Sequence, residues 1–404
     1  MNARLMLAAS LLAAALAACA AGLIITSGFV GDAGISDTVV YATYGERIAS
    51  GDMPYRDFEV EYPPGALVPF VVPALVSSTQ SRYDDFFEPL MVVALAVASC
   101  LIVVSLRALE ASPRRVVFAV ASFLTGVILL GPFVLTRFDL YAAAVCLAAI
   151  CAILHRRAYL GPILLGAAIA TKIYPAVMLP LLVVRTWKRE GPTAAMRGIA
   201  LTIGAVLVLY LPFALLAPEG VVKSVWRQVG RPLQIESLAS AVLLALHHAA
   251  GMPLDWASGS GSQNLTGAVS GVASAVTTVV GVAALGFVWV KFERGDSYEA
   301  ARFVRYAAAA TVAFVTFGKV LSPQFLVWLL AIVVLVPGVR GAIAIILLLV
   351  ACLLTRGWFP HGYWDLVKQF DPTASWLVLA RDLVLVAVFA VLVARLRARE
   401  PAKG

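Results

Sequence analysis

The stretch FFEPLMVVALAVASCLIVVSL, residues 86–106, decides the fold class of this chain. It runs for 21 residues and carries a single charged side chain, Glu88, near its start. A helix of about 20 apolar residues is long enough to cross the hydrocarbon core of a bilayer. Residues 86–106 therefore predict a membrane-spanning helix.

The composition of the whole chain extends this prediction. Hydrophobic residues make up 61% of the 404 positions and charged residues 13%, against roughly 25% charged in soluble domains. The cations behind the net charge of +8 fall in short clusters between apolar blocks, without interleaved aromatic residues. We expect an all-α polytopic membrane protein whose partner is the lipid bilayer, and no nucleic-acid partner.

The cysteines indicate neither disulfides nor a metal site. All five lie inside apolar blocks, and no pair has a metal-ligand spacing: Cys19, Cys100, Cys146, Cys151 and Cys352. Residues 16–19 resemble a bacterial lipoprotein cleavage box, which is the alternative interpretation of the N-terminus. Because the apolar run continues to Ile25, we expect a retained first helix.

Basic clusters indicate the orientation, because cytoplasmic loops carry an excess of Lys and Arg. Arg4 places the N-terminus inside, and the further clusters are Arg107/Arg114/Arg115, His155/Arg156/Arg157, Arg185/Lys188/Arg189, Lys291/Arg294/Arg302/Arg305, Arg340 and Arg395/Arg397/Arg399. Placing all of them in the cytoplasm gives about twelve crossings, with both termini inside: 5–30, 86–106, 116–136, 139–154, 159–171, 173–184, 197–217, 267–290, 306–321, 324–338, 341–356 and 375–395.

Two stretches need a special arrangement. Residues 159–184 are too short for two full spans, so we expect two short helices that break near Pro175. Residues 236–250 are apolar, but another crossing there would invert the rest of the path. We expect a re-entrant or interfacial helix.

The remaining polar material falls outside the membrane. Three long segments, 31–85, 218–266 and 357–374, are predicted to be extracytoplasmic parts of one membrane domain, residues 1–404. They hold most of the acidic and aromatic residues outside the spans, so any chemistry is expected at this face. The aromatics around His361 either stack on a sugar or form an interfacial belt, and we favour the belt. The adjacent His247 and His248 point in different directions on a helix and predict no metal site.

Asp37 is the first candidate catalytic residue. It follows the first span and starts a predicted helix on which positions 37, 41 and 44 share a face. A carboxylate at the membrane surface can act as a general base towards a hydroxyl group. A helix N-cap is the structural alternative for the same residue.

Several motifs, in this order, resemble a known family. They are Asp37-x₃-Tyr41, Gly51-x₂-Pro54-Tyr55-x-Asp57-Phe58, Glu61-Tyr62-Pro63-Pro64-Gly65, Arg137-Phe138-Asp139, residues 166–175 with Lys172, and residues 319–328 with Lys319 and Gln324. Together they resemble the polyprenol-phosphate-sugar-dependent membrane glycosyltransferases of the GT-C superfamily. The closer resemblance is to glycosyltransferase family 87, which includes actinobacterial α-1,2-mannosyltransferases.

The resemblance implies transfer with inversion, in which an Asp of the first external loop removes the acceptor proton. Asp37 matches that position, with Asp32, Asp52, Asp57, Glu59 and Glu61 as competitors. We expect no metal and no cofactor. Tyr41, Tyr62 and Gln324 are carried over as substrate-binding residues.

Cations at the outer boundary are the candidates for binding the phosphate of the donor. Lys172 lies at the predicted helix break and Lys319 at the outer end of a span, and snorkelling is the structural alternative for both. Arg137 and Arg231 are further candidates, although Arg137 can instead pair with Asp139. Arg356 is a weaker candidate.

The predicted function is transfer of a sugar, mannose by resemblance, from a polyprenyl phosphate to an extracytoplasmic glycolipid or polysaccharide. Transfer of arabinofuranose, glucose or another sugar, or transfer to a lipid, is the first alternative. A transporter or flippase of lipid-linked precursors is the alternative from another class, and a non-catalytic scaffold is the last.

Overall fold

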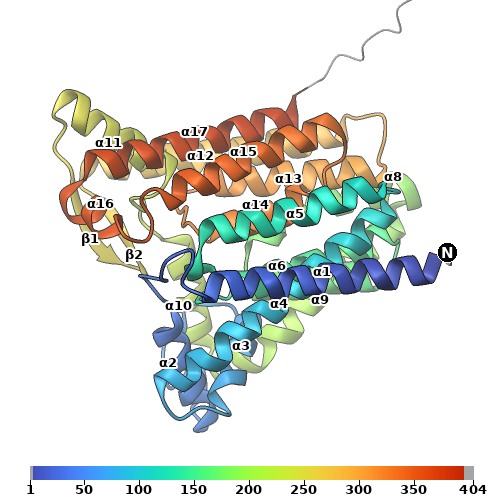
Figure 1. The fold of residues 1–404 in the computed structure, drawn as a ribbon, viewed down its shortest axis with the longest axis horizontal. Coiled ribbons are helices and arrows are strands. Elements are labelled where there is room, and N and C mark those ends of the chain that lie inside the picture. The colour runs from blue at the N-terminus through green and yellow to red at the C-terminus, as the bar shows by residue number, and fades with distance from the viewer. Residues whose placement is uncertain (1–2, 395–404) are drawn as a thin grey trace, which may run out of the picture.

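Long apolar helices run side by side through the molecule, and short helices gather at one end of them (Figure 1). The computed structural model describes residues 3–394. Its helices are α1 (Ala3–Thr26), α2 (Thr38–Ala49), α3 (Leu67–Ala74), α4 (Gln80–Ala108), α5 (Pro113–Leu130), α6 (Asp139–Leu154), α7 (Leu160–Thr171), α8 (Leu179–Glu190), α9 (Pro192–Leu216), α10 (Pro218–Val229), α11 (Leu238–Ala250), α12 (Ala268–Glu293), α13 (Ala300–Thr316), α14 (Phe325–Val333), α15 (Gly338–Arg356), α16 (Tyr363–Gln369) and α17 (Pro372–Val393). The described residues also form three 3₁₀ turns, η1 (Pro64–Ala66), η2 (Pro132–Val134) and η3 (Tyr174–Met178). The remaining secondary structure is a hairpin of β1 (Asp255–Gly259) and β2 (Ser262–Thr266).

The predicted all-α membrane fold is confirmed. Seven of the described helices are long and apolar enough to cross a membrane: α1, α4, α5, α9, α12, α15 and α17. The other five predicted crossings overlap the shorter helices α6, α7, α8, α13 and α14, although the crossing 173–184 covers η3 and only the first half of α8. The count of twelve crossings stays a prediction.

The interior of the bundle is built from the shorter helices. In α14, every residue from Leu326 to Val333 is buried, and α6 and α13 are buried along most of their length. By contrast, α9 and α12 expose rows of Val and Leu side chains, such as Val208 and Val279. Such apolar surfaces face lipid in a membrane protein. The short helices therefore form the core, and α9 and α12 form part of the lipid-facing wall.

Two helix breaks position polar residues between the helices. The helix α7 ends at Thr171, and η3 begins at Tyr174 with Pro175 in its first turn, as predicted. A second break follows α5, where Gly131 has a φ of +90° and Pro132 starts η2. Pro stops helices, and a positive φ favours Gly. Because α6 packs against α7, the two breaks bring Arg137, Asp139 and Lys172 into one region.

The basic clusters meet at one end of the bundle. Arg189 pairs with Glu299 at 3.1 Å and Lys188 with Glu293 at 3.6 Å. Arg305 and Arg340 both donate to the carbonyl oxygen of Ala394. The cluster Arg395/Arg397/Arg399 lies outside the described residues.

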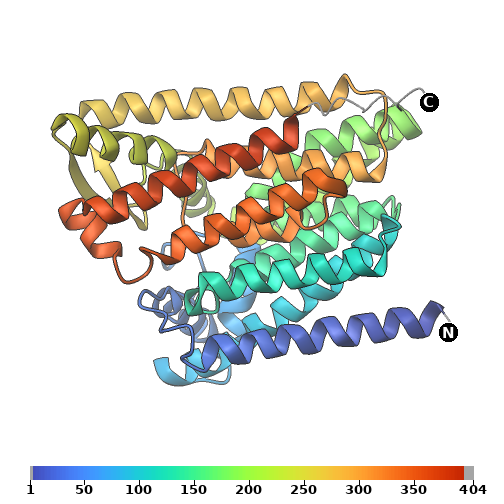
Figure 2. The same cartoon turned by 45° about the horizontal axis from the view of Figure 1, so that its top comes forward.

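Figures 1 and 2 place the N-terminus and the end of α17 at this basic end, and α2, α10, α11, α16 and the hairpin at the other. The three predicted external segments thus share one end of the molecule. Which side of the membrane that end faces stays a prediction.

Candidate active site

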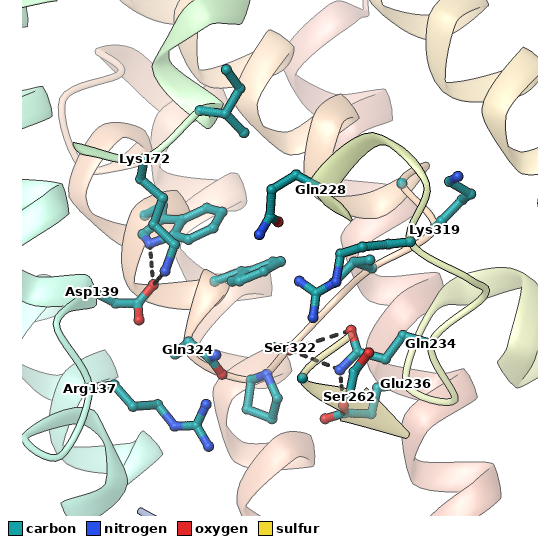
Figure 3. A pocket seen from close by; sticks show the side chains of 18 of the residues that line it. Arg137, Asp139, Lys172, Gln228, Gln234, Glu236, Ser262, Lys319, Ser322 and Gln324 are labelled. Atoms are coloured by element: carbon teal, nitrogen blue, oxygen red, sulfur yellow. Dashed lines mark hydrogen bonds and ion pairs between the residues drawn. The ribbon is translucent and has the colours of Figure 1, made fainter. Parts of the chain in front are cut away.

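A cavity of about 570 Å³ is lined by residues of α2, α10 and α16, which lie at the end of the bundle opposite the basic clusters (Figure 1). Figure 3 shows polar side chains pointing into it from several elements. Its lining includes the main catalytic and substrate-binding candidates, which are Asp37, Tyr41, Tyr62, Arg137, Lys172, Arg231, Lys319 and Gln324, but not the weaker candidate Arg356. Segments far apart in the chain thus converge on one site.

Asp37 lies on the wall of the cavity formed by α2. It is the residue before the helix, but its side chain makes no capping hydrogen bond to the backbone, so the N-cap alternative does not explain it. Its Oδ2 is 2.9 Å from Arg137 Nη1 and accepts a hydrogen bond of 3.3 Å from the Tyr41 hydroxyl. Both contacts use the same oxygen, and 29% of the side chain stays exposed. A hydroxyl group that enters the cavity can therefore reach the carboxylate.

An aromatic cluster holds Tyr41 in this position. Its ring stacks on Phe70 at 4.2 Å between centroids, and Tyr62 and Phe138 pack edge-on against it. Burial raises the pKa of the Tyr41 phenol well above its usual value. The phenol therefore stays protonated and donates to Asp37.

Most of the competing carboxylates of the first segment have other partners. Asp52 pairs with Arg47, Asp57 with Arg56, and Glu59 with Lys223 and Arg227. Glu61 lines the cavity together with Asp37. Asp32, the remaining competitor, does not line the cavity. Which residue is the base stays a prediction.

Lys172 is ion-paired rather than snorkelling. Its Nζ lies 2.6 Å from Asp139 Oδ1, which also accepts a hydrogen bond of 2.8 Å from the Trp328 indole. The ammonium group lies 4.2 Å from the centre of the Phe138 ring. The suggested pairing of Arg137 with Asp139 is wrong, because Arg137 pairs with Asp37. Arg137 lies in the bend before α6, whereas Asp139 is the first residue of that helix and pairs with Lys172.

Arg231 and Lys319 differ from Lys172 and Arg137, because within residues 3–394 neither pairs with a carboxylate. An Arg231 Nη donates to the carbonyl oxygen of Ser260 at 2.7 Å, while its buried Nε has no partner among the described residues. Lys319 donates to the carbonyl oxygen of Val229 at 3.2 Å. Cations without a counter-ion are suited to bind an anionic group.

One part of the cavity, the apolar arm, is formed against α12, a helix of the lipid-facing wall. It is lined by Gly281, Val282 and Leu285 of α12 and by Phe314 and Phe317. Val282 is 65% exposed. The cavity thus combines apolar side chains from a lipid-facing helix with polar side chains such as Lys319.

The opposite wall carries a polar group that the sequence did not single out. Gln234 donates to Ser322 at 2.9 Å and also to Glu236. Glu236 is buried, and burial raises the pKa of its carboxyl to about 7, against the opposing charges of Arg381 and Arg137. In the sequence, Glu236 is one carboxylate beside the Ser237 cap of an apolar helix, so no local pattern distinguishes it.

The aromatic segment near residue 360 contributes to the cavity rather than to a surface belt. Trp358 and Phe359 are buried, and Phe359, Tyr363 and Trp364 line the cavity. Among the described residues, no three His, Cys, Asp or Glu side chains are grouped so that they can hold a metal ion.

The fold and this cavity define a class of molecule: a polytopic membrane protein with a polar site that is partly lined by a lipid-facing helix. Comparison with known protein families then identifies the family. The sequence model of glycosyltransferase family 87 matches residues 61–323, more than half of the chain. The chain belongs to this family and is a membrane-embedded glycosyltransferase. A comparison with curated proteins finds no match.

Family membership favours a transferase over the transporter and scaffold alternatives. The matched residues include Arg137, Lys172, Arg231 and Lys319, but they begin after Asp37 and end one residue before Gln324. The role of Asp37 therefore depends on its geometry and on the resemblance of the first-loop motif.

Proposed function

We propose that the protein is an inverting glycosyltransferase that moves mannose from a polyprenyl phosphate to a hydroxyl group of an extracytoplasmic glycolipid or polysaccharide. One observation supports the lipid-linked donor: the same cavity is lined by apolar residues of the lipid-facing helix α12 and by the unpaired cations Arg231 and Lys319. A ligand that fits both parts has a long apolar chain and an anionic head. A polyprenyl phosphate has both.

The reaction follows from the arrangement of charges. Asp37 takes the proton from the acceptor hydroxyl, whose oxygen attacks the anomeric carbon of the sugar. The bond from that carbon to the phosphate oxygen breaks, and the electron pair leaves with the polyprenyl phosphate. Arg231 and Lys319 stabilise the charge of this leaving group. Arg137 orients Asp37, and Lys172 is held in its place by Asp139.

The identity of the sugar depends on the resemblance to mannosyltransferases. Arabinofuranose and glucose are the competing sugars. The extracytoplasmic placement depends on the basic clusters at the other end of the bundle, which favour the cytoplasm.

The test uses purified protein in lipid nanodiscs with a membrane lipid extract as acceptor. Radiolabelled polyprenyl-phosphate mannose, glucose and arabinofuranose are compared with GDP-mannose. We expect label to transfer from polyprenyl-phosphate mannose and not from the nucleotide sugar. Transfer from another lipid-linked sugar would change the proposed sugar but leave the lipid-linked donor in place. Transfer only from GDP-mannose would overturn the proposal.

A further inference from the structure

Two hydrogen-bond acceptors in the cavity have no donor. The Oε1 atoms of Glu236 and Gln324 are buried and unpartnered among the described residues, and both side chains line the cavity. A buried acceptor without a donor is unfavourable by about 1–3 kcal/mol. Natural proteins satisfy such groups or use them to bind a ligand.

Glu236 is held rigidly from several sides. The Gln234 amide donates to its Oε2, and Ser322 in turn accepts a hydrogen bond from Gln234 at 2.9 Å. From α17, the buried Arg381 donates to the main-chain carbonyl of Glu236 at 2.6 Å. One carboxyl oxygen is thus fixed within the protein, while the other lacks a partner. This is the pattern of a side chain oriented for recognition.

Glu236 and the proposed base share one cavity. Asp37, Arg137 and Glu236 all line it, and Arg137 pairs with Asp37. Figure 3 shows Arg137 and Glu236 extending towards the same part of the cavity from opposite walls. Arg231 comes from the loop after α10, and Lys319 comes from the segment after α13. A ligand that extends from Asp37 across the cavity to the opposite wall therefore meets Glu236.

We propose that Glu236 and Gln324 form a subsite that binds hydroxyl groups of the acceptor sugar next to the hydroxyl that Asp37 deprotonates. Gln324 Oε1 is an acceptor, and Glu236 Oε1 accepts when the carboxyl is ionised and donates when it is protonated. A sugar offers several adjacent O–H groups, each of which can donate and accept. This assignment depends on the proposed function for the position of the acceptor. The subsite selects acceptors by the hydroxyl groups that flank the attacking one.

The test removes the acceptor atom from the protein and the hydroxyl group from the substrate in turn. Transfer to octyl α-mannoside is compared with transfer to its four monodeoxy analogues, for the wild type, Glu236→Met and Glu236→Gln. In the wild type, we expect one deoxy analogue to raise the acceptor KM about 10-fold. In Glu236→Met, the KM of the parent acceptor should rise by the same factor, and the deoxy analogue should raise the KM no further. Glu236→Gln keeps an acceptor oxygen, so its KM for the parent acceptor should lie between those of the wild type and Glu236→Met.

The matched control is Glu46→Met, an exposed carboxylate of α2 that does not line the cavity. It should keep the wild-type discrimination, and donor KM should be unchanged in every variant. If Glu236→Met discriminates against every deoxy analogue as the wild type does, the subsite is wrong.

A binding measurement separates this inference from the proposed function. Saturation-transfer NMR is recorded with methyl α-mannoside, methyl α-glucoside and methyl α-arabinofuranoside. A sugar signal that is strong in the wild type and lost several-fold in Glu236→Met supports the subsite even if no lipid-linked donor is used. Equal signals in both proteins, or none from any sugar in the wild type, would contradict it.

Discussion

At the scale of single residues, the cavity contains cations of two kinds. Arg137 and Lys172 are neutralised by Asp37 and Asp139, whereas Arg231 and Lys319 pair with no carboxylate among residues 3–394. The first two keep the polar interior of the bundle electrically balanced. The second two remain available to an anionic substrate. This difference separates residues that the sequence treated alike.

Asp37→Asn tests the base. Asparagine keeps the shape of the side chain but is not basic, so we expect kcat to fall roughly 10²–10⁴-fold. Donor binding should persist, because Arg231 and Lys319 are unchanged. The control is Asp57→Asn, which alters an exposed pair with Arg56. Near-wild-type turnover in Asp37→Asn beside an inactive Glu61→Gln would move the base to Glu61.

Lys172→Met and Lys319→Met should behave differently. The first leaves Asp139 buried without its cation, which typically destabilises a protein by about 3–5 kcal/mol. We expect a clear drop in melting temperature, recovered in part by adding Asp139→Asn. Lys319→Met should keep the wild-type melting temperature and raise the donor KM about 10-fold. Equal melting temperatures for Lys172→Met and the wild type would show that the pair does not stabilise the fold.

At the scale of elements, α12 has two roles, as lipid-facing wall and as lining of the apolar arm. Thr278 lines the cavity, whereas its neighbour Val279 is 68% exposed and does not. Thr278→Trp should fill the arm and raise the KM for long-chain donors more than for a short-chain analogue. Val279→Trp adds the same ring outside the arm and should have no such effect. An equal response of the two variants, at both chain lengths, would place the lipid chain elsewhere.

The elements that the sequence predicted are those with local signals. Apolar runs located the long helices, and Pro175 located the break after α7. The hairpin of β1 and β2 had no comparable signal, because its second strand is held from outside: Leu265 and Gln263 hydrogen-bond to the backbone of Leu233 and Ile235. Stability that comes from distant segments leaves no periodic pattern in the strand itself.

The site was predictable to a similar extent. Motifs brought out seven of the eight cavity residues, and Arg231 was added as a candidate cation, but the sequence did not show which of them pair. Pairing depends on the direction in which each side chain points. Arg137 points to Asp37, whereas Asp139, two residues further on, points to Lys172. Glu236 was missed because its buried setting is made by Gln234, Ser322 and Arg381, which packing brings together.

At the scale of the whole molecule, the basic end and the cavity end define an orientation. Cysteines introduced at the exposed positions Ser50 and Ser258 should react with an impermeant maleimide in intact cells. A cysteine at Ser297, near the basic end, should react only after permeabilisation. The wild-type chain, with its five native cysteines, sets the background. The reverse pattern would place the cavity in the cytoplasm.

The central claim is that one cavity receives a lipid-linked donor from the bilayer and holds its phosphate beside the polar centre. Cryo-electron microscopy of the protein in nanodiscs with a polyprenyl monophosphate tests it most directly. We predict phosphate density between Arg231 and Lys319 and chain density along Gly281 and Leu285 of α12. Phosphate density at Lys172 with Asp139 displaced, or a chain bound away from α12, would contradict this account.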